Sequence, residues 1–264
     1  MPWLQKKTRK ENTSFIELAP AGLCDIHAHI LPGLDDGAQN LSETLEMLKG
    51  MAELGYTLIV ATPHFNLASM SPRQGDQQSL IAEIQDHHGL TGLRILPGAE
   101  IEFNEVFLAE EKTGKIPRIG SERTYLVEFG FSPGSVPLGI ADVFFRFRAQ
   151  GGNLIVAHPE RAPDFQSNPH KIDQLRHLGA LVQVDLTSLS GRYGATVERM
   201  ARKLIEEGRA DLVASDIHQP ADLKRLSRTL EELAKRDEIS FVRLASTHPH
   251  LIAAGRFDEV EQNA

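Results

Sequence analysis

The sequence predicts an α/β fold in which seven parallel strands alternate with helices and form a closed or nearly closed barrel. Two observations support this prediction: short runs rich in Val, Ile and Leu recur along the chain, and amphipathic helical patterns lie between them. One apolar run and the helix after it span roughly 30 residues, the size of a βαβ unit. The same order of elements also allows a doubly wound open sheet, which is the alternative fold.

The apolar runs are near-continuous, which is typical of strands that are buried on both faces of a parallel sheet. None of them approaches the roughly 20 apolar residues that a membrane-spanning helix needs, so we expect no stable membrane insertion. The expected strands are Leu23–Ile26, Leu58–Ala61, Leu93–Leu96, Tyr125–Phe129, Leu154–Ala157, Leu181–Val184 and Leu212–Ala214.

The clearest helical pattern covers Leu41–Leu54. Asn40 is a candidate N-cap, Glu43 completes a box-like start, and Gly55 lies where a glycine commonly ends a helix. The face expected to be apolar consists of Leu41, Leu45, Leu48 and Ala52. Further helices are expected at Ile140–Gln150, Pro169–Leu178, Thr196–Glu207, Ala221–Lys235 and Thr247–Ala254.

No Gly-rich linker or change in composition divides the chain, so residues 21–264 are expected to form one domain. Residues 1–20 are expected to form a flexible arm that is basic at Lys6–Lys10, and Ser69–Gln78 is expected to be a surface loop. The basic patch is not followed by an apolar run, so it lacks the pattern of a secretory signal. We expect the arm to be a solvated tail, and attraction to an acidic membrane or kinase tail is the alternative.

Composition and cysteine usage exclude several classes of protein. The 264 residues carry a formal net charge of −8, which is unfavourable for a general nucleic-acid binder. The single cysteine, Cys24, cannot form an internal disulfide, which suits a reducing cytoplasm. A cysteine-dependent phosphatase needs an arginine six residues after the cysteine, and here Ile30 occupies that position. Cys24 also lies in an apolar run, so we interpret it as a core residue.

Six of the seven expected strands end in a His, Asp or Glu that could bind a metal or act in catalysis. Because the C-terminal ends of parallel barrel strands meet at one face, residues distant in the sequence would become neighbours there. In strand order, the candidates are His27, His29, Asp35 and Asp36; His64; Glu100; Glu128; His158, Glu160 and Arg161; and Asp216 and His218.

The spacing of these residues indicates a metal centre. Residues two apart in a strand point the same way, so His27 and His29 can offer two imidazoles to one ion. Asp216 and His218 repeat this pattern. Imidazole together with carboxylate suits Zn²⁺, Mn²⁺ or Fe²⁺. The candidates are too many for one ion, and two or three bridged ions would form a clamp for phosphoryl displacement, so we predict a metal-dependent phosphoesterase.

The segment Asp25–Gly37 resembles the opening motif of the bacterial capsule-biosynthesis protein-tyrosine phosphatases, which belong to the PHP (polymerase and histidinol phosphatase) superfamily. Later segments resemble this family's other motifs in the same order, and the resemblance covers Leu23 to Gly255, most of the chain. These later segments are Ala61–His64, Leu96–Ile101, Ala157–Arg161, Ser188–Gly194 and Ala214–His218.

The resemblance implies a distorted (β/α)7 TIM-like barrel of the PHP type. It also implies a cluster of two or three ions, usually described with Mn²⁺, for which Fe, Zn, Co or Mg could substitute. Arg161 matches an arginine that grips the substrate phosphate. The implied ligands are His27, His29, Glu100 and Asp216 for one ion, Asp36, His64 and His218 for a second, and Glu100, Glu128 and His158 for a third.

The reaction implied by the resemblance is hydrolysis of phosphotyrosine. The expected partner is a tyrosine kinase that controls exopolysaccharide or capsule synthesis, and the expected location is the cytoplasm. A hydroxide that bridges the metals would attack phosphorus in line with the leaving oxygen. Three residues depart from the family pattern: Phe65 replaces a second histidine, Gln219 replaces an asparagine, and Arg225 lies away from the usual spacing of a downstream arginine. These departures concern the substrate rather than the metals.

Three other functions are compatible with parts of the pattern. A small-molecule phosphatase, such as a histidinol-phosphate phosphatase, would use similar chemistry. An amidohydrolase is disfavoured because Glu128 and Asp185 occupy positions where that class typically has a lysine and a histidine. A regulatory binding module without activity is disfavoured by the complete set of ligands. The sequence does not predict the oligomeric state or the physiological metal.

Overall fold

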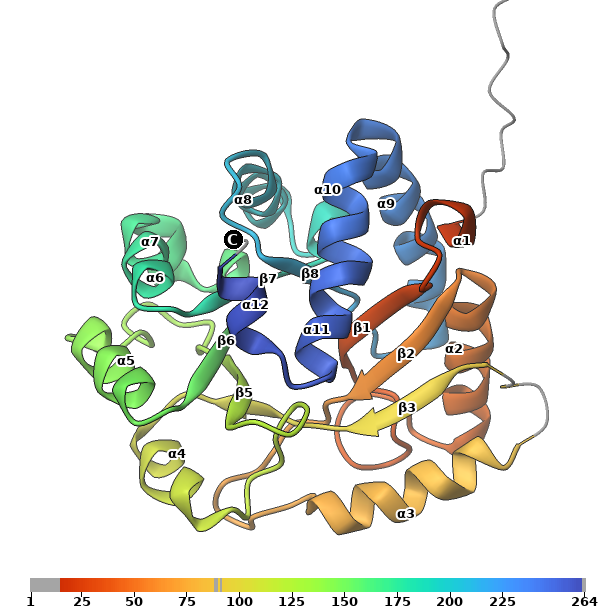
Figure 1. Ribbon diagram of the computed structural model, residues 1–264, viewed down its shortest axis with the longest axis horizontal. Coiled ribbons are helices and arrows are strands. Elements are labelled where there is room, and N and C mark those ends of the chain that lie inside the picture. Colours follow the sequence, from red (N-terminus) through yellow and green to blue (C-terminus); the bar gives the residue numbers. More distant parts are fainter. Residues whose placement is uncertain (1–14, 88–89, 91, 263–264) are drawn as a thin grey trace, which may run out of the picture.

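The computed structural model describes residues 15–87, 90 and 92–262. Figure 1 shows parallel strands in the middle of the molecule with helices around them. The strands are β1 (Leu23–Ala28), β2 (Tyr56–Ala61), β3 (Arg94–Pro97), β4 (Glu100–Glu102), β5 (Thr124–Glu128), β6 (Asn153–Ala157), β7 (Leu181–Asp185) and β8 (Leu212–Ala214). The helices are α1 (Phe15–Leu18), α2 (Leu41–Glu53), α3 (Gln74–Gln85), α4 (Glu105–Glu110), α5 (Ile140–Ala149), α6 (Pro163–Ser167), α7 (His170–His177), α8 (Ala195–Glu206), α9 (Leu223–Arg236), α10 (Glu238–Val242), α11 (His248–Ala253) and α12 (Phe257–Glu261).

The strands form two parallel sheets rather than one regular closed barrel. The first sheet has the order β1-β2-β3, and the second has the order β4-β5-β6-β7-β8. Two isolated parallel bridges connect the sheets, one between Ala28 and Ile217 and the other between His64 and Glu100. The predicted alternation of parallel strands and helices is therefore confirmed, whereas closure of the barrel by continuous pairing is not.

An additional short strand follows the third expected strand. The strand predicted at Leu93–Leu96 is present as β3, which ends at Pro97, and β4 begins at Glu100, so the described residues contain eight strands. Gly98 lies in the gap, where a Cβ atom would come within 2.7 Å of Val60 Cγ1. The close approach of the two segments requires glycine at this point. The break ends the first sheet and carries Glu100 into the second.

Strand β1 contains a bulge at the residues that lead to the candidate site. Asp25 pairs with Ile59 and Ala28 pairs with Ala61, so β1 has one more residue in this interval than β2. A bulge of this kind re-aims the side chains that it contains. His27 lies within it, and its Nδ1 atom is 3.0 Å from Gln183 Oε1 of β7.

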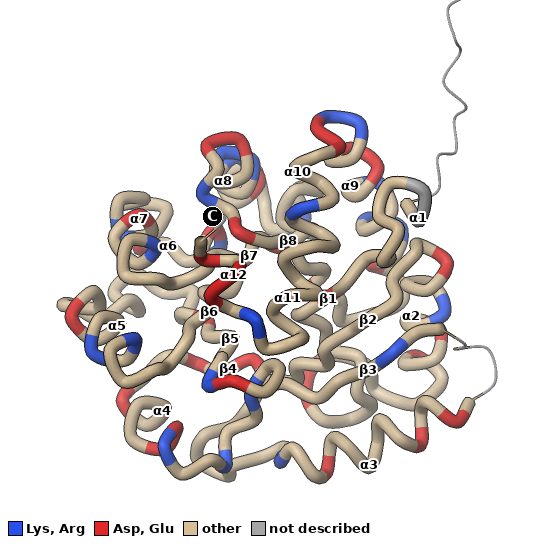
Figure 2. Tube along the Cα trace, viewed as in Figure 1, with Lys and Arg blue, Asp and Glu red and all other residues tan. Residues whose placement is uncertain are grey.

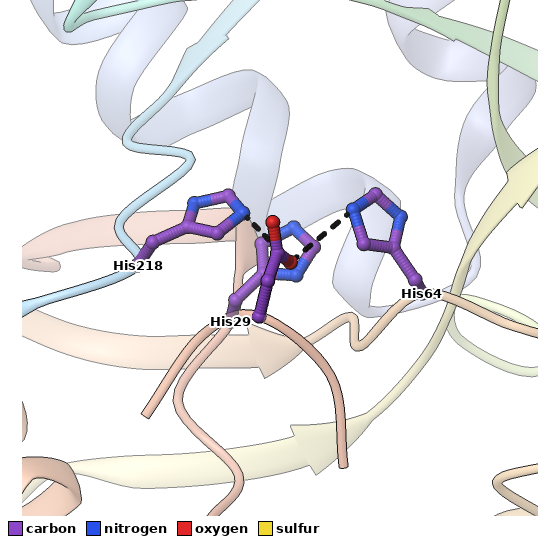
Figure 3. Close-up of side chains that lie close together, drawn as sticks. His29, His64 and His218 are labelled. Atoms are coloured by element: carbon purple, nitrogen blue, oxygen red, sulfur yellow. Dashed lines mark ion pairs between the residues drawn. The ribbon is translucent and has the colours of Figure 1, made fainter. Parts of the chain in front are cut away.

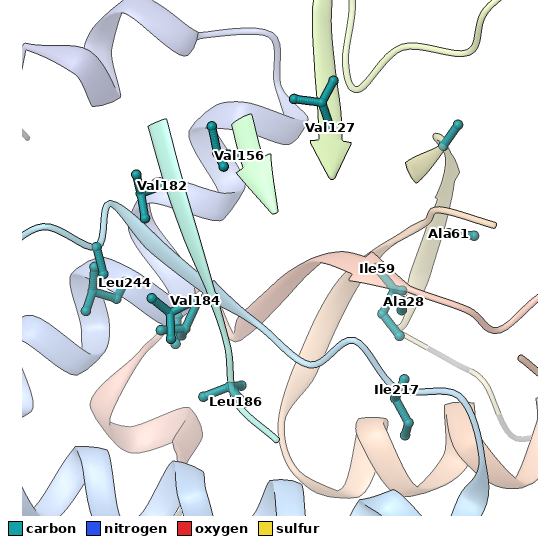
Figure 4. Close-up of a cluster of buried hydrophobic side chains, with 14 of the residues drawn as sticks. Ala28, Ile59, Ala61, Val127, Val156, Val182, Val184, Leu186, Ile217 and Leu244 are labelled. Carbon is teal, nitrogen blue, oxygen red and sulfur yellow. The ribbon is translucent and has the colours of Figure 1, made fainter. Parts of the chain in front are cut away.

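The hydrophobic core consists of two clusters on opposite faces of the strands. The smaller cluster includes Val60 and Leu126 together with Phe257 from α12. The larger cluster includes the neighbouring residues Ile59 and Val127, and Figure 4 shows part of it. Because successive strand residues enter different clusters, both faces of the strands are buried, which explains the near-continuous apolar runs in the sequence. Cys24 belongs to the smaller cluster, and burial raises the pKa of its thiol, in agreement with its interpretation as a core residue.

Helix α2 begins and ends as predicted, and its expected face packs against the core, but its most buried residues lie to one side of that face. The side chain of Asn40 accepts a hydrogen bond of 3.0 Å from Glu43 N, and Gly55 has a positive φ of 93° just after the helix. Thr44 is buried because its hydroxyl donates to Ile30 O at 2.8 Å, which rotates the buried stripe away from the expected one. The buried residues are Thr44, Met47, Leu48 and Met51, so of the expected face only Leu48 is fully buried.

Two further expectations need correction. The surface loop expected at Ser69–Gln78 is wrong after Arg73, because α3 begins at Gln74. The polar residue Gln77 occupies a buried position of this helix, which concealed its amphipathic pattern in the sequence. Most of the arm expected at residues 1–20, including Lys6–Lys10, lies outside the described residues. Its last part is folded, because Phe15–Leu18 form α1 and Ala19 is buried.

The charges on the outer helices are mixed. Figure 2 shows Lys and Arg interspersed with Asp and Glu along α5, α8 and α9, so these helices do not form the basic face that a nucleic-acid binder would need. Among the described residues, no helix has both the length and the apolar character required to cross a bilayer.

We predict that Asn40→Ala lowers the free energy of unfolding by about 1 kcal/mol, because it removes the cap of α2. Urea denaturation measures this change. Ser42→Ala is the control, since Ser42 is exposed on the same helix and is not the cap. Equal effects of the two substitutions would contradict the capping role.

Candidate metal centre

The residues singled out in the sequence converge at the C-terminal ends of the strands. Eight of the nine expected ligands fall into three overlapping groups, in each of which the ligand atoms lie within 4.8 Å of one another. The groups are His27, His29, Glu100 and Asp216; His29, Asp36, His64 and His218; and His64, Glu100 and Glu128. His158 lies outside these groups but contacts Glu100.

The ligand atoms of the most buried group are spaced closely enough to share one cation. The Nε2 atoms of His27 and His29 lie 3.2 Å apart. Glu100 Oε2 lies 3.2 Å from Nε2 of His27 and 3.3 Å from Nε2 of His29. Asp216 Oδ1 lies 3.3 Å from each of the same two nitrogen atoms. Bonds of about 2.0–2.1 Å to a tetrahedral ion place its ligand atoms about 3.3–3.4 Å apart, so these edges match one central ion.

The inner oxygen of Asp216 supports the same interpretation. Asp216 Oδ1 is buried and accepts no hydrogen bond from the part of the chain that the structure describes. Leaving a buried carboxylate oxygen without a donor or a cation is strongly destabilising. Glu100 points a second buried carboxylate oxygen at the same two imidazoles. These donor atoms therefore fit a divalent cation.

The second group is more open to solvent. Asp36 Oδ1 lies 3.6 Å from His64 Nε2 and 3.5 Å from His218 Nε2. Figure 3 shows His64 and His218 on either side of His29, with dashed lines marking these two ion pairs. The side chain of Asp36 is 70% exposed and that of His64 is 40% exposed, so a cation here would lie nearer the solvent.

The third group differs from the expected set. His64 Nδ1 lies 3.1 Å from Glu100 Oε2 and 3.4 Å from Glu128 Oε1. His158 was expected to bind this ion, but its Nε2 atom is 2.7 Å from the other oxygen of Glu100. A cleft of about 510 Å³ adjoins this group, and Asp36, Glu102 and Glu128 contribute to its lining.

Polar neighbours orient the candidate ligands. His27 Nδ1 contacts Gln183 Oε1 at 3.0 Å, and His29 Nδ1 contacts Asp35 Oδ2 at 2.7 Å. Such partners fix the ring so that its other nitrogen faces a metal. Asp35 was expected as a candidate at the end of the first strand but not in this role, and Gln183 was not expected. The signal that could have indicated Gln183 is its polar side chain within the otherwise apolar run Leu181–Val184.

Electrostatics in the inner group favour charged forms. Burial by itself would lower the pKa of His27, but the carboxylates of Glu100 and Asp216 outweigh it and raise this pKa to about 9. The pKa of His29 is also raised, because its contacts with Asp216, Asp35 and Glu100 overcome burial. Conversely, burial would raise the pKa of Glu100, but the nearby histidines, His27 first, hold it well below its usual range. Without metal, the group is therefore held together by protonated histidines.

The backbone is strained at two candidate site residues. Asp216 has a φ of 47° and His158 has a φ of 30°. Among the described residues, Met70 is the one other non-glycine residue with positive φ. Such conformations cost about 1–3 kcal/mol each and are concentrated at functional sites. The strain indicates that the positions of Asp216 and His158 serve the function of the site at a cost in local stability.

Arg161 lies between the candidate metal centre and two aromatic rings. Its Nη1 atom donates to Asp216 Oδ2 at 2.6 Å. The guanidinium carbon is 4.5 Å from the ring centre of Phe131 and 4.3 Å from that of Tyr193. Burial would lower the pKa of Arg161, but Asp216 raises it above its usual value, so the cation is permanent. Tyr193 lies in the segment Ser188–Gly194 that resembles a family motif, but its contact with Arg161 was not predicted, and Phe131 was not singled out in the sequence.

Comparisons with known proteins place this site in context. Residues 23–244 match the family described as capsular polysaccharide synthesis, CpsB/CapC. CapC of Staphylococcus aureus is 30% identical over 210 residues, which cover 77% of this chain and 82% of that protein. The tyrosine-protein phosphatase YwqE of Bacillus subtilis (strain 168) is 29% identical over 202 residues, or 74% of this chain and 77% of YwqE.

The fold is also similar to that of a solved structure from the same group of relatives. The crystal structures of YwqE from Bacillus subtilis and CpsB from Streptococcus pneumoniae, described as unique metal-dependent tyrosine phosphatases, include a chain that matches with a TM-score of 0.79. The sequence identity is 26%, and the match covers 88% of this chain and 94% of the other.

We predict that metal binding at pH 7 releases roughly one to two protons, because His27 and His29 are protonated without metal and must become neutral to bind it. The affinity for metal should therefore rise with pH up to about 9, the pKa of His27. Calorimetric titration of Mn²⁺ in buffers with different ionisation enthalpies measures the release. A binding enthalpy independent of the buffer would contradict this protonation scheme.

Proposed function

Because the chain belongs to the CpsB/CapC family of capsular polysaccharide synthesis, we propose that it is a metal-dependent protein-tyrosine phosphatase. The observation that carries this proposal is the inner group of His27, His29, Glu100 and Asp216, whose spacing fits one ion, with Arg161 bonded to the same Asp216. The relatives named above as tyrosine-protein phosphatases, and the related structure described as metal-dependent, support it.

The proposed cofactor is two or three Mn²⁺ ions, for which Fe, Zn, Co or Mg could substitute. His27, His29, Glu100 and Asp216 are the proposed ligands of the first ion. For the other two, the proposed ligands are Asp36, His64 and His218, and Glu100, Glu128 and His158. When bound, divalent ions would lower the pKa of a coordinated water molecule toward neutrality. They would also neutralise negative charge on a phosphoryl group.

The charges around the site explain why a phosphate would need these cations. The carboxylates of Asp36, Glu100, Glu128 and Asp216 surround the site and would repel a phosphate dianion. The one positive charge of Arg161 does not balance four carboxylates once His27 and His29 are neutral and bind metal. The planar guanidinium of Arg161 can hold two phosphate oxygens at once, and its bond to Asp216 and the ring of Tyr193 restrict its orientation.

The leaving group needs little stabilisation by the enzyme. The phenol of tyrosine has a pKa near 10, so its phenolate departs more readily than an alkoxide would. Orienting the phosphate and excluding competing contacts are therefore the main tasks of the protein side chains, and Arg161 is the residue placed for the first of them.

The proposal extends to the setting of the enzyme. The proposed substrate is phosphotyrosine on a kinase that controls exopolysaccharide or capsule synthesis, and the proposed location is the cytoplasm, which suits the unpaired thiol of Cys24. Residues 21–264 form the proposed catalytic domain. The two sheets are proposed to represent a distorted (β/α)7 barrel whose closure depends on the bridges at Ala28 and His64.

We predict that the protein with Mn²⁺ releases phosphate from a phosphotyrosine peptide and does so faster than from histidinol phosphate. The double variant His27→Ala with His29→Ala should lose at least about a thousandfold in rate, equivalent to roughly 4 kcal/mol, because it removes half of the inner ligand set. Phosphate release assays measure both effects.

His170→Ala is the matched control for this variant, because His170 is 85% exposed and contacts Asp173 instead. It should retain full activity. Phosphotyrosine turnover that survives a chelator or the double substitution would refute metal dependence. Faster turnover of histidinol phosphate would instead favour the small-molecule phosphatase.

We predict that Arg161→Lys raises KM for the phosphotyrosine peptide about tenfold or more, because lysine keeps the charge but loses the two-point grip. Metal content, measured by elemental analysis, should stay unchanged. Arg146→Lys, at an exposed position of α5, is the control. An unchanged KM in Arg161→Lys would exclude the proposed grip.

A further inference from the structure

Phe131 is a large apolar side chain that stands half-exposed beside the candidate site. The residue is 51% exposed. One exposed apolar residue is ordinary in a globular protein, so exposure alone indicates nothing. The position is informative, because the ring centre lies 4.5 Å from the guanidinium carbon of Arg161 and 5.9 Å from the ring centre of His158. Phe131 therefore borders both the proposed phosphate grip and the ligand set.

The loop that carries Phe131 is fixed in place. It follows β5, and Asp164 of α6 accepts hydrogen bonds from Gly134 N at 3.0 Å and from Val136 N at 2.8 Å. Ser135 Oγ donates to Ser132 O at 2.7 Å, which closes the turn. The loop thus presents the ring in a defined position, and preorganisation of this kind reduces the entropy lost on binding.

The two aromatic neighbours of Arg161 are not equivalent. Tyr193 lies 4.3 Å from the guanidinium carbon and is partly covered, whereas about half of the Phe131 surface remains open to solvent. A phosphate held by Arg161 would bring the group attached to it close to Phe131. An aromatic ring gains from offset or edge-to-face contact with another ring, which an alkyl phosphate cannot make.

We infer that Phe131 is a specificity-determining residue that contacts the phenyl ring of the substrate and so favours aryl over alkyl phosphates. This inference rests on the proposed phosphatase function and names the substrate class of the same site. It assigns Phe131 a task distinct from positioning Arg161, because positioning would affect every phosphate equally.

The test compares two inert ligands that share one phosphonate group. Benzylphosphonate and methylphosphonate are titrated calorimetrically into the Mn²⁺-loaded protein. We expect the wild-type protein to prefer benzylphosphonate. Phe131→Ala should weaken benzylphosphonate about tenfold and leave methylphosphonate unchanged, whereas Phe131→Trp should keep the preference.

Leu138→Ala is the control, since Leu138 is a 99% exposed apolar residue that also lies between β5 and α5. It should change neither affinity. If Phe131→Ala weakens both phosphonates by the same factor, or weakens neither, the inference is overturned. It is also overturned if the wild-type protein binds both equally or binds neither.

Failure of the proposed function gives a different result. A wild-type protein that prefers benzylphosphonate through Phe131, yet releases no phosphate from a phosphotyrosine peptide, would refute the phosphatase activity and keep the ring contact. Turnover of the peptide without a Phe131-dependent preference would refute only the role of Phe131.

Discussion

Two buried carboxylates, Glu100 and Asp216, converge on the facing Nε2 atoms of His27 and His29, and the rest of the site depends on this arrangement. Among the described residues the inner oxygen of Asp216 makes no well-formed hydrogen bond, and its neighbours are the two Nε2 atoms, each 3.3 Å away. Positive charge must balance the pair, and protonated histidines or a metal can supply it. In the proposed function, a bound metal supplies this positive charge.

The same contact connects the two sheets. His27 belongs to β1 of the first sheet, whereas Glu100 and Asp216 belong to β4 and the segment after β8 of the second. Asp216 N donates to His27 O at 2.9 Å, and His29 N donates to Ile217 O at 3.0 Å. The bulge in β1 and the strained backbone of Asp216 occur at this junction. A bound cation would offset that strain by stabilising the folded state.

The strands, most of the long helices and the convergence of the ligands could be predicted from the sequence, because these depend on local apolar patterns and on the rule that parallel strands end at one face. The full burial of Thr44 on α2 could not be predicted, since it depends on the hydrogen bond of its hydroxyl to Ile30 O. The break between β3 and β4 depends on the packing of Gly98 against Val60. The contacts of Phe131 and Tyr193 with Arg161 could not be predicted, because they depend on loops that are far apart in the sequence.

The most direct test of the central claim is anomalous diffraction from crystals grown with Mn²⁺, measured on both sides of the manganese absorption edge. We expect a peak enclosed by His27, His29, Glu100 and Asp216, with one or two further peaks near His64. Density elsewhere on the surface, or an inner group that binds no manganese while the crystal remains ordered, would contradict it.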